Sequence, residues 1–464
     1  MSREQAIARA ERYFDEGGFF TELARRIAIP TESQNPERRP DLQRYLVEEM
    51  EPSLNRLGFV CKVLANPAEI GGPFLYAERT EDPALFTVFS YGHGDVIRGQ
   101  DEQWRSGLSP WKLTREGDRL YGRGTADNKG QHTINLAALE AALATRGKLG
   151  FNIKFLIETG EEIGSPGLRR FCEQHKDLLR SDVLIASDGP RLTPSQPTIF
   201  LGTRGVMNID LHIDLREGGH HSGNWGGLLA NPGILLAQAL ASITGPRGEI
   251  KVDEWRPNSL TESVREALAG IEVDGGPDGP KIDRNWGEPD LTPAERVFGW
   301  SSFEVLAFVC GNPDRPVNAI PPRARAHCQL RYVVGVDKDD IVPSLQRHLE
   351  RQGFPMVRVS QARDEAMAAT RLDPRHPWVR WAKGSIERTT GSRVAVLPNL
   401  GGSLPNDVFS DVLGLPTIWI PHSYASCSQH APNEHLLAPV ARDALRLMAG
   451  LMWDLGELRG RAPA

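Results

Sequence analysis

The residues most able to do chemistry are carboxylates and histidines in five short segments, several of which directly follow predicted strands. The first is 91–96 (YGHGDV), which carries His93 and Asp95. Residues two apart in an extended segment project to the same side, so His93 could bind a cation through one ring nitrogen while Asp95 accepts a hydrogen bond from the other. Taken alone this pattern is common, and a turn-capping aspartate beside an incidental histidine would explain it better.

The second and third segments are also acidic and contain several glycines. In 121–130 (YGRGTADNKG), Asp127 stands on a loop before a predicted helix. In 158–165 (ETGEEIGS), Glu161 and Glu162 are adjacent, which is electrostatically costly unless a cation lies beside them. One carboxylate could bind the cation while its neighbour stays free as a general base. Taken alone, these segments would be a helix N-cap and a solvated acidic turn.

The last two segments add one carboxylate and several histidines. Asp188 follows another predicted strand, in SDGP, and offers a carboxylate at the same edge of the sheet. Near the C-terminus, QHAPNEH contains His430 and His435, and His422 lies close by in the sequence. The chemistry of the residues alone does not choose among these three histidines.

Each segment is weak evidence by itself, but the five together favour a metal site. Oxygen and imidazole ligands without a thiolate suit zinc, with manganese or cobalt as alternatives. Three carboxylates and two histidines suffice for two ions that share one bridging carboxylate. A phosphate-binding loop is a poor alternative for 121–130, because that segment has neither the GxGxxG nor the GxxxxGK(S/T) spacing.

The elements that must position these segments alternate between strands and helices. Short β-branched and aromatic runs predict strands at 86–91, 151–157 and 183–186. Apolar residues at steps of three and four predict helices at 41–57 and 134–144. Such alternation is typical of a parallel sheet covered on both faces, and ligands bind at the carboxyl ends of its strands.

The secondary-structure pattern predicted from the sequence changes twice, which indicates two domains. From about residue 197 the pattern is long, alternating and β-like, and from about residue 366 the earlier α/β pattern returns. We therefore expect a catalytic domain in two parts, 1–196 and 366–464, interrupted by an α+β lid or dimerisation domain at 197–365. A length of 464 residues agrees with more than one hydrophobic core.

The composition limits the partners and the compartment. A formal charge of -6 without a basic tract disfavours nucleic acid and anionic membranes as partners, and a small-molecule ligand is favoured. Five widely spaced cysteines without a CxxC pair suit a reducing compartment. The segment MSREQAIARAERYF lacks the apolar core of a secretory signal, and no apolar run approaches the roughly 18 residues of a membrane span. We expect a cytoplasmic protein.

In type and order, these motifs resemble the co-catalytic zinc metallopeptidase family that includes carnosinase and cytosolic dipeptidases, aminoacylase, succinyl-diaminopimelate desuccinylase and glutamate carboxypeptidase. The resemblance extends over nearly the whole chain. It implies an α/β fold, in which a zinc-peptidase-like catalytic domain with a mostly parallel central sheet is interrupted by a smaller α+β lid or dimerisation domain. It also implies two divalent metal ions, with zinc as the first expectation and manganese or cobalt as alternatives.

The resemblance assigns a role to each motif. GHxDV implies a metal ligand and an orienting carboxylate, ExGEExGS implies a general base followed by a ligand, and HxxNE implies a last ligand that only His430 fits. His422 and His435 are then structural or orient other groups. Asn128 stands where the family often has aspartate, a departure expected to have little mechanistic consequence. The implied metal ligands are His93, Asp127, Glu162, Asp188 and His430, and the implied catalytic residues are Glu161, Asp95 and His221.

The predicted insert also matches the family. HHSG resembles the HSG motif of the family's lid domain, whose histidine reaches the active site of the partner subunit in dimeric members, so His221 implies a homodimer. Asn318 and Arg331 match substrate-binding positions at the lid end, and Gly402 and Ser403 match a loop that holds the substrate's carboxylate end. An arginine placed for bidentate binding would favour substrates with a free carboxylate, although Arg331 could equally be an ordinary exposed residue.

Together these residues predict a hydrolase that cleaves an amide bond in a dipeptide or small peptide with a free carboxylate. A metal-bridged hydroxide would attack the carbonyl, Glu161 would act as general base and then as acid, and His221 would help to stabilise the oxyanion. The nearest alternative is an N-acyl amino acid deacylase of aminoacylase or desuccinylase type. An alternative of another class is a non-catalytic metal- or peptide-binding protein, which would need no free base beside its metal.

Overall fold

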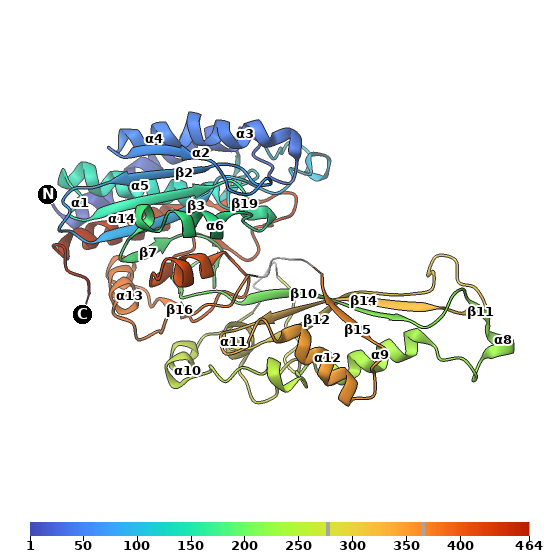
Figure 1. Ribbon diagram of the computed structural model, residues 1–464. Helices are drawn as coiled ribbons and strands as arrows, with labels where there is room; N and C mark the ends of the chain where they lie inside the picture. The colour runs from blue at the N-terminus through green and yellow to red at the C-terminus, as the bar shows by residue number, and fades with distance from the viewer. Residues whose placement is uncertain (275–278, 363–366, 464) are drawn as a thin grey trace.

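The computed structural model describes residues 1–274, 279–362 and 367–463. Figure 1 shows a larger body, which contains both chain termini, and a smaller elongated body that extends away from it. The larger body is built on an eight-stranded sheet with the order β1-β2-β6-β3-β7-β17-β9-β16. Its strands are β1 (Val60–Leu64), β2 (Phe74–Arg79), β6 (Asn152–Glu158), β3 (Thr87–His93), β7 (Val183–Ala186), β17 (Thr417–Trp419), β9 (Thr198–Phe200) and β16 (Ala395–Leu397).

The centre of this sheet is parallel. β3 pairs in parallel with β6 and β7, β17 with β7, and β16 with β9. Among the described strands, the pairs β1 with β2, β2 with β6, and β17 with β9 are antiparallel. The strands predicted at 86–91, 151–157 and 183–186 are confirmed as β3, β6 and β7, and the predicted mostly parallel sheet is confirmed with them. Because β3, β6 and β7 run in the same direction, their carboxyl ends lie at one edge.

Helices cover both faces of the sheet because successive strand residues belong to different cores. In β7, Val183 and Ile185 join one core, whereas Leu184 and Ala186 join the other. The first core packs against α5, which contacts α1 and α14, and against α13. The second core includes residues of α6. These helices are α1 (Arg3–Asp15), α5 (Lys129–Arg146), α6 (Leu168–Gln174), α13 (Pro377–Thr390) and α14 (Ala438–Glu457).

Helix α5 begins earlier than the apolar pattern at 134–144 predicts. It starts at Lys129, two residues after Asp127, and its first turn is fully buried. The close approach of Gly130 to the preceding loop permits this, because a Cβ atom at Gly130 would lie 1.9 Å from the backbone oxygen of Thr125. The loop that carries Asp127 is therefore packed directly onto the start of a rigid helix.

The helix predicted at 41–57 is present but changes its hydrogen bonding in the middle. It consists of α3 (Arg39–Arg44), a π-helical segment (Tyr45–Met50) and α4 (Glu51–Arg56). Pro52 has no backbone N–H and cannot bond to the carbonyl four residues earlier. The backbone N–H of Glu51 instead donates to the oxygen of Leu46, five residues earlier, which is the π-helical bond.

The smaller body is a four-stranded antiparallel sheet with two helices on one face, and it is called the lid below. The strand order is β12-β14-β10-β15, and alternate residues of β10, from Met207 to Ile213, are buried with α9 and α12. The other face of β10 carries polar residues, and Figure 1 shows α9 and α12 along one side of the sheet. The elements are β10 (Gly205–Asp214), β12 (Ser302–Cys310), β14 (Arg323–Tyr332), β15 (Arg358–Gln361), α9 (Pro232–Ile243) and α12 (Ile341–Arg351).

The predicted domain boundaries, after residues 196 and 365, remain predictions. β9 lies just beyond the first boundary and still pairs within the larger sheet, so the chain enters the lid sheet only at Gly205. Residues 363–366, at the second boundary, lie outside the described residues. Within the described ranges, no helix is both long enough and apolar enough to cross a membrane.

Gly130→Ala should destabilise the protein, because the added Cβ atom would collide with the backbone oxygen of Thr125. We expect the free energy of unfolding to fall by about 1–3 kcal/mol in a denaturant titration, the usual effect of overpacking. Gly384→Ala in α13 is the matched control, because a Cβ atom there meets nothing within 4 Å outside its own helix backbone. That change should raise stability by up to about 1 kcal/mol. Equal free energies of unfolding for the two variants would contradict the close packing of Gly130 against the backbone of Thr125.

Candidate metal centre

A first group of three ligand side chains forms at the carboxyl edge of the large sheet. His93 is the last residue of β3 and is fully buried. Its Nε2 atom lies 2.9 Å from Asp127 Oδ1 and 3.4 Å from Asp188 Oδ2. Asp188 follows β7, and ligand atoms from all three residues lie within 4.8 Å of one another.

A second group of three uses the other oxygen of Asp127. His430 Nε2 lies 3.1 Å from Asp127 Oδ2 and 3.0 Å from Glu162 Oε2. These three residues also place one ligand atom each within 4.8 Å of the others. The structure therefore brings together all five predicted metal ligands, in two groups that share Asp127.

The electrostatics of the two groups favour bound positive charge. Burial and the neighbouring Asp127 raise the pKa of Glu162 to about 7. Hydrogen bonds to Asp127 and Glu162 raise the pKa of His430 to about 11, so the cluster draws protons onto its own histidine. Asp188 Oδ2 is buried and accepts no hydrogen bond within the described chain. An orphaned carboxylate oxygen among repelling carboxylates is well satisfied by a cation, and the oxygen and imidazole donors fit a divalent metal.

Asp95 holds the turn that presents the two adjacent glutamates. Its carboxylate accepts hydrogen bonds from the backbone N–H groups of Glu161, at 3.2 Å, and Glu162, at 3.1 Å. The sequence predicts that this carboxylate orients His93, and the distance from His93 Nδ1 to Asp95 Oδ1 is 3.4 Å. The closer partner of that ring nitrogen is the backbone oxygen of Asp95, at 3.1 Å. Asp95 thus fixes both the imidazole and the glutamate turn.

Glu161 lies beside the cluster without belonging to either group of three. It begins a short 3₁₀ turn (Glu161–Ile163) directly after β6. Burial raises the pKa of its carboxyl well above the ordinary value; the charge of His93 opposes the rise and that of Glu162 adds to it. A carboxyl that is available beside a cation site, with a pKa moved upward, can take up and release a proton.

Glu434 organises the loop that carries Asp127, a role that sequence reasoning missed. Its Oε1 accepts hydrogen bonds from the backbone N–H groups of Gly124, Ala126 and Asp127 at 3.0, 2.9 and 3.2 Å. Its Oε2 accepts from Arg123 Nη1 at 2.8 Å, and both side chains are buried. The motifs GRG and HxxNE contain these residues, but only the fold shows that they form one ion pair.

The two histidines that the motif match excludes as metal ligands, His422 and His435, are buried and have other hydrogen-bond partners. His422 Nε2 lies 2.9 Å from Ser187 Oγ and 3.1 Å from Asn135 Oδ1. His435 Nε2 lies 2.7 Å from the hydroxyl of Tyr424. Neither histidine belongs to a group of three potential ligands within the described chain. Their geometry agrees with the structural roles that the motif match implies.

Two of the predicted substrate-binding residues meet where the lid joins the larger body. Arg331 Nη1, from β14, donates to Ser403 Oγ at 2.8 Å, and Gly402 lies in the same loop. Ser403 Oγ in turn donates to the backbone oxygen of Arg204 at 2.6 Å. The Arg204 side chain donates to the backbone oxygen of Gly401 at 2.9 Å, so it braces this loop. Arg204 was not predicted, and a lone arginine in GTRGV offers no signal for such a role.

The other two lid residues, His221 and Asn318, lie at the far end of the lid. His221 ends β11 (His220–His221), which pairs with β13 (Ala319–Ile320), and the backbone N–H of Ser222 donates to Asn318 O at 2.9 Å. Both residues are exposed. Figure 1 shows β11 and α8 (Ser222–Trp225) at the tip of the lid, remote from the large sheet. Within one chain, the structure separates this pair from the cation cluster.

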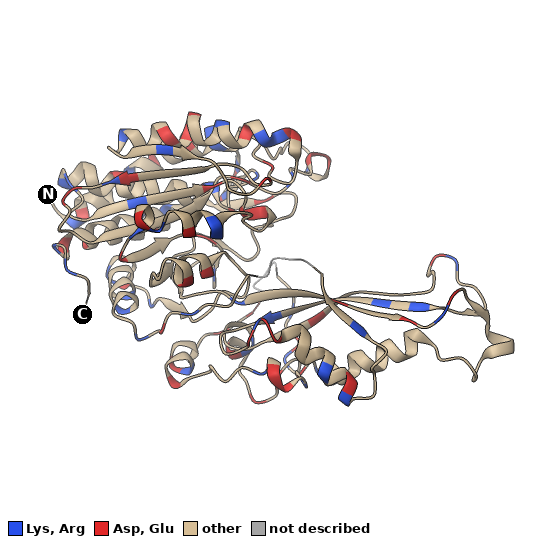
Figure 2. Ribbon diagram, in the orientation of Figure 1, with Lys and Arg blue, Asp and Glu red and all other residues tan. Residues whose placement is uncertain are grey.

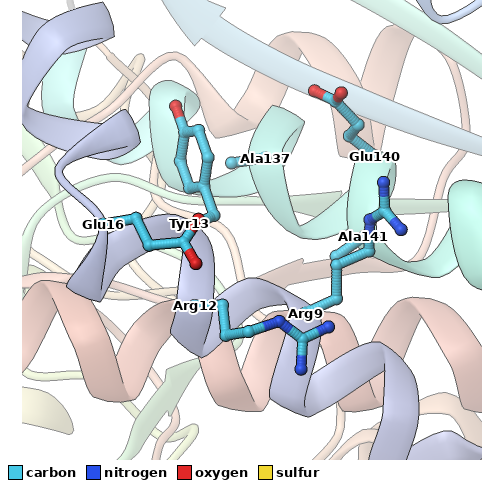
Figure 3. Close-up of a pocket in the computed structure, with 7 residues that line it drawn as sticks. All are labelled: Arg9, Arg12, Tyr13, Glu16, Ala137, Glu140 and Ala141. Carbon is cyan, nitrogen blue, oxygen red and sulfur yellow. The ribbon is translucent and has the colours of Figure 1, made fainter.

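A separate hollow of about 340 Å³ lies on the outer helices, and Figure 3 shows the side chains around it. Its lining comes from α1 and α5 and includes Arg9, Arg12 and Glu140. None of the predicted site residues lines it. Two arginines and two glutamates line it, so this hollow has no distinct charge environment. Basic and acidic residues are likewise interspersed over the visible elements of both bodies (Figure 2).

Comparison with known proteins gives consistent results. Residues 89–454 match the model of a protein family described as Peptidase family M20/M25/M40. The chain is 34% identical to a Beta-Ala-His dipeptidase of Mus musculus over 78% of this chain and 76% of that protein. It is 24% identical to a cysteinylglycine-S-conjugate dipeptidase of Corynebacterium striatum, over 69% and 70% of the two lengths.

Solved structures share the fold over nearly the whole chain. A metallo-carboxypeptidase of the M20 family, Sso-CP2 from Sulfolobus solfataricus, superposes with a TM-score of 0.78 and 25% identity, covering 95% of this chain and 99% of that one. Human carnosine dipeptidase 1 superposes with a TM-score of 0.75 and 24% identity, covering 98% and 99%. The predicted fold class, an interrupted α/β catalytic domain with a smaller α+β domain, is confirmed.

His430→Ala should remove one of two bound divalent ions, because it deletes a ligand of the second group only. Metal analysis after dialysis against zinc should then find about one equivalent per chain, since one cation site of the pair is lost. His435→Ala is the control, because that histidine is buried against Tyr424 and belongs to neither group. It should keep the unmodified metal content. Two equivalents in the His430 variant would contradict the assignment of this histidine.

Proposed function

The chain belongs to peptidase family M20/M25/M40, and from this premise we propose that it hydrolyses the amide bond of a dipeptide or small peptide with a free carboxylate. The predicted family and the predicted enzyme class, a metallopeptidase, are confirmed by that membership, which sets aside a non-catalytic binding protein. The relatives named as dipeptidases favour a dipeptide over an N-acyl amino acid as the substrate. The observation that carries the proposal is Glu161, half-buried beside both ligand groups but part of neither.

Two divalent cations would be held by the two groups of ligands. His93, Asp127 and Asp188 would hold the first, and Asp127, Glu162 and His430 the second. Zinc suits this set of oxygen and imidazole donors best, and manganese or cobalt also accepts such a set. When bound, such ions polarise a carbonyl oxygen and lower the pKa of water.

Glu161 would carry the proton through the reaction. Its carboxylate accepts a proton from the attacking water and then passes it to the nitrogen of the leaving amine. Burial raises the pKa of this carboxyl well above its ordinary value, which makes it a better proton acceptor than an ordinary glutamate. Asp95 keeps Glu161 in place through the backbone N–H of the glutamate turn.

Arg331 and Ser403 would bind the free carboxylate of the substrate. Among the described residues, the hydrogen-bond partners of the Arg331 guanidinium, Gln329 and Ser403, are neutral, so its charge is open to a ligand. Ser403 and the backbone of Gly402 lie in the same loop and can donate further hydrogen bonds. A planar guanidinium binds carboxylates in a bidentate way, which favours substrates that end in a free carboxylate.

A second copy of the chain would complete the site. His221 and Asn318 are remote from Arg331 and Ser403 within one chain, so a site that uses all four residues must combine two chains. Strand β12 forms an edge of the lid sheet and exposes Val305, Leu306, Phe308 and Val309 by 44–55%. Exposed apolar residues on an edge strand favour pairing with another chain. In such a homodimer, the tip of each lid would bring His221 to the partner's site to stabilise the oxyanion.

The compartment proposed for the protein is the cytoplasm. All five cysteines, Cys61, Cys172, Cys310, Cys328 and Cys427, are free thiols. Free thiols persist in reducing compartments, whereas secreted proteins tend to pair them.

A hydrolysis screen on zinc-, manganese- and cobalt-loaded protein tests the proposed function. Dipeptides, the same dipeptides with an amidated C-terminus, and N-acetyl and N-succinyl amino acids would be compared by kcat/KM. The proposal requires that free dipeptides react best and that Arg331→Met removes their advantage over the amides. Preferred cleavage of N-acyl amino acids would instead establish the deacylase alternative.

Glu161→Gln should lower kcat by roughly 10²–10⁴-fold, because an amide cannot shuttle the proton. Metal analysis should still find two ions, since this residue belongs to neither ligand group. Glu162→Gln is the matched neighbour and should lose metal from the second group. Near-normal turnover by the Glu161 variant would reject its assignment as the base.

His221→Ala should lower kcat by roughly 10²–10³-fold, as the loss of an oxyanion donor does. Mixed with Glu161→Gln chains, it should regain about a quarter of the unmodified activity, because half the dimers are mixed and each contains one intact site. Activity would be measured before and after the chains exchange. If exchange occurs without recovery, the site is not shared between subunits.

A further inference from the structure

Asn128, the residue that departs from the aspartate often found in the family, lies behind the first group of ligands. Its side chain is fully buried, and its Nδ2 donates to the backbone oxygen of Ser187 at 2.9 Å. Ser187 precedes Asp188, and Asn128 follows Asp127. This hydrogen bond therefore links the backbone segments of Asp127 and Asp188. Both of these ligands approach the imidazole of His93.

The same amide is ordered from its other side by a buried chain of hydrogen bonds. Asn128 Oδ1 lies 3.1 Å from His132 Nδ1, and His132 Nε2 lies 2.6 Å from the hydroxyl of Tyr45. All of these side chains are fully buried. Burial also moves the pKa of His132 well below its ordinary value, which agrees with a neutral imidazole.

Only one arrangement of protons satisfies this chain. The carbonyl of Ser187 can only accept, so the amide nitrogen of Asn128 must face it and the amide oxygen must face His132. His132 Nδ1 then carries the hydrogen, and its Nε2 accepts from Tyr45. A carboxylate at position 128 would have no hydrogen for Ser187, and two oxygens would meet at that contact.

The third ligand segment touches the same pair. A Cβ atom at Gly92, the residue before His93, would lie 3.1 Å from His132 Cβ and 3.2 Å from Asn128 Oδ1. The contact between Asn128 and His132 therefore packs against the backbone that carries His93. Asn128 thus lies close to Gly92, which precedes His93. It is hydrogen-bonded to Ser187, which precedes Asp188, and it is covalently linked to Asp127.

We propose that Asn128 is a positioning residue for the first cation: its neutral amide, ordered by His132 and Tyr45, holds the segments of His93, Asp127 and Asp188 at the spacing that a shared cation requires. This inference rests on the cation site of the proposed function. Residues that orient metal ligands without touching the metal commonly change its affinity by about 10–100-fold. On this proposal the departure at position 128 has a consequence that the motif match alone does not predict.

The test measures the first site by itself. In a His430→Ala background, which disables the second group, zinc and cobalt affinities would be measured by chelator competition, and the cobalt absorption spectrum would be recorded. Asn128→Ala should weaken the single remaining site by about 10–100-fold and alter that spectrum. Asn128→Asp should also weaken it, despite the added negative charge, because it cannot donate to Ser187. An unchanged affinity in the alanine variant, or a tighter site in the aspartate variant, would overturn the inference.

Two controls separate positioning from general loss of stability. Ser187→Ala removes the hydroxyl but keeps the carbonyl that accepts from Asn128, so its cation affinity should stay within about threefold of the background. Leu330→Ala destabilises the buried core of the lid, which is separate from the core that includes Tyr45, and should lower the unfolding midpoint without weakening the cation site. If Leu330→Ala lowered the cation affinity as much as Asn128→Ala, the effect of Asn128 would be a loss of folding stability and not of positioning.

The outcome also separates this inference from the proposed function. If the His430→Ala protein binds cations as described but the unmodified protein hydrolyses no peptide, the proposed function fails and the positioning role stands. If no cation binds to either protein, both fail.

Discussion

The mutual repulsion of four carboxyl groups at one edge of a parallel sheet is the constraint on which the rest of the structure depends. Asp127, Glu161, Glu162 and Asp188 share this space, and two histidines approach them. Asp95 fixes the glutamate turn through backbone N–H groups, but hydrogen bonds leave Asp188 with an orphaned oxygen. The carboxylates therefore need either protons or a cation among them, and that requirement links the fold to metal-dependent chemistry.

The lid carries candidate functional residues at both of its ends. Its junction with the larger body carries Arg331 and its tip carries His221, with the length of β10 and β14 between them. β10 and β14 pair along their full lengths, so the sheet itself keeps these ends apart. The same sheet has an apolar edge strand, β12, so the element that separates the two ends also offers a surface for a second chain.

Much of the fold and of the metal centre could be predicted because the signals are local. Carboxylates and histidines at strand ends or a few residues after them predict convergence at one edge, and His93, Glu162 and Asp188 lie there. Other features depend on contacts between distant segments and leave no local pattern. The ion pair of Arg123 with Glu434 and the bracing of Ser403 by Arg204 are of this kind. The early start of α5 escaped prediction because polar residues fill its buried first turn.

The bond between Glu434 and the loop of Asp127 spans more than three hundred residues of chain. During synthesis, Arg123 and that loop leave the ribosome long before their partner exists. Until residue 434 emerges, the guanidinium of Arg123 and three backbone N–H groups lack their native partner. The metal centre therefore cannot take its final form until His430 and Glu434 have been synthesised, because the first is a candidate ligand and the second holds the loop of Asp127.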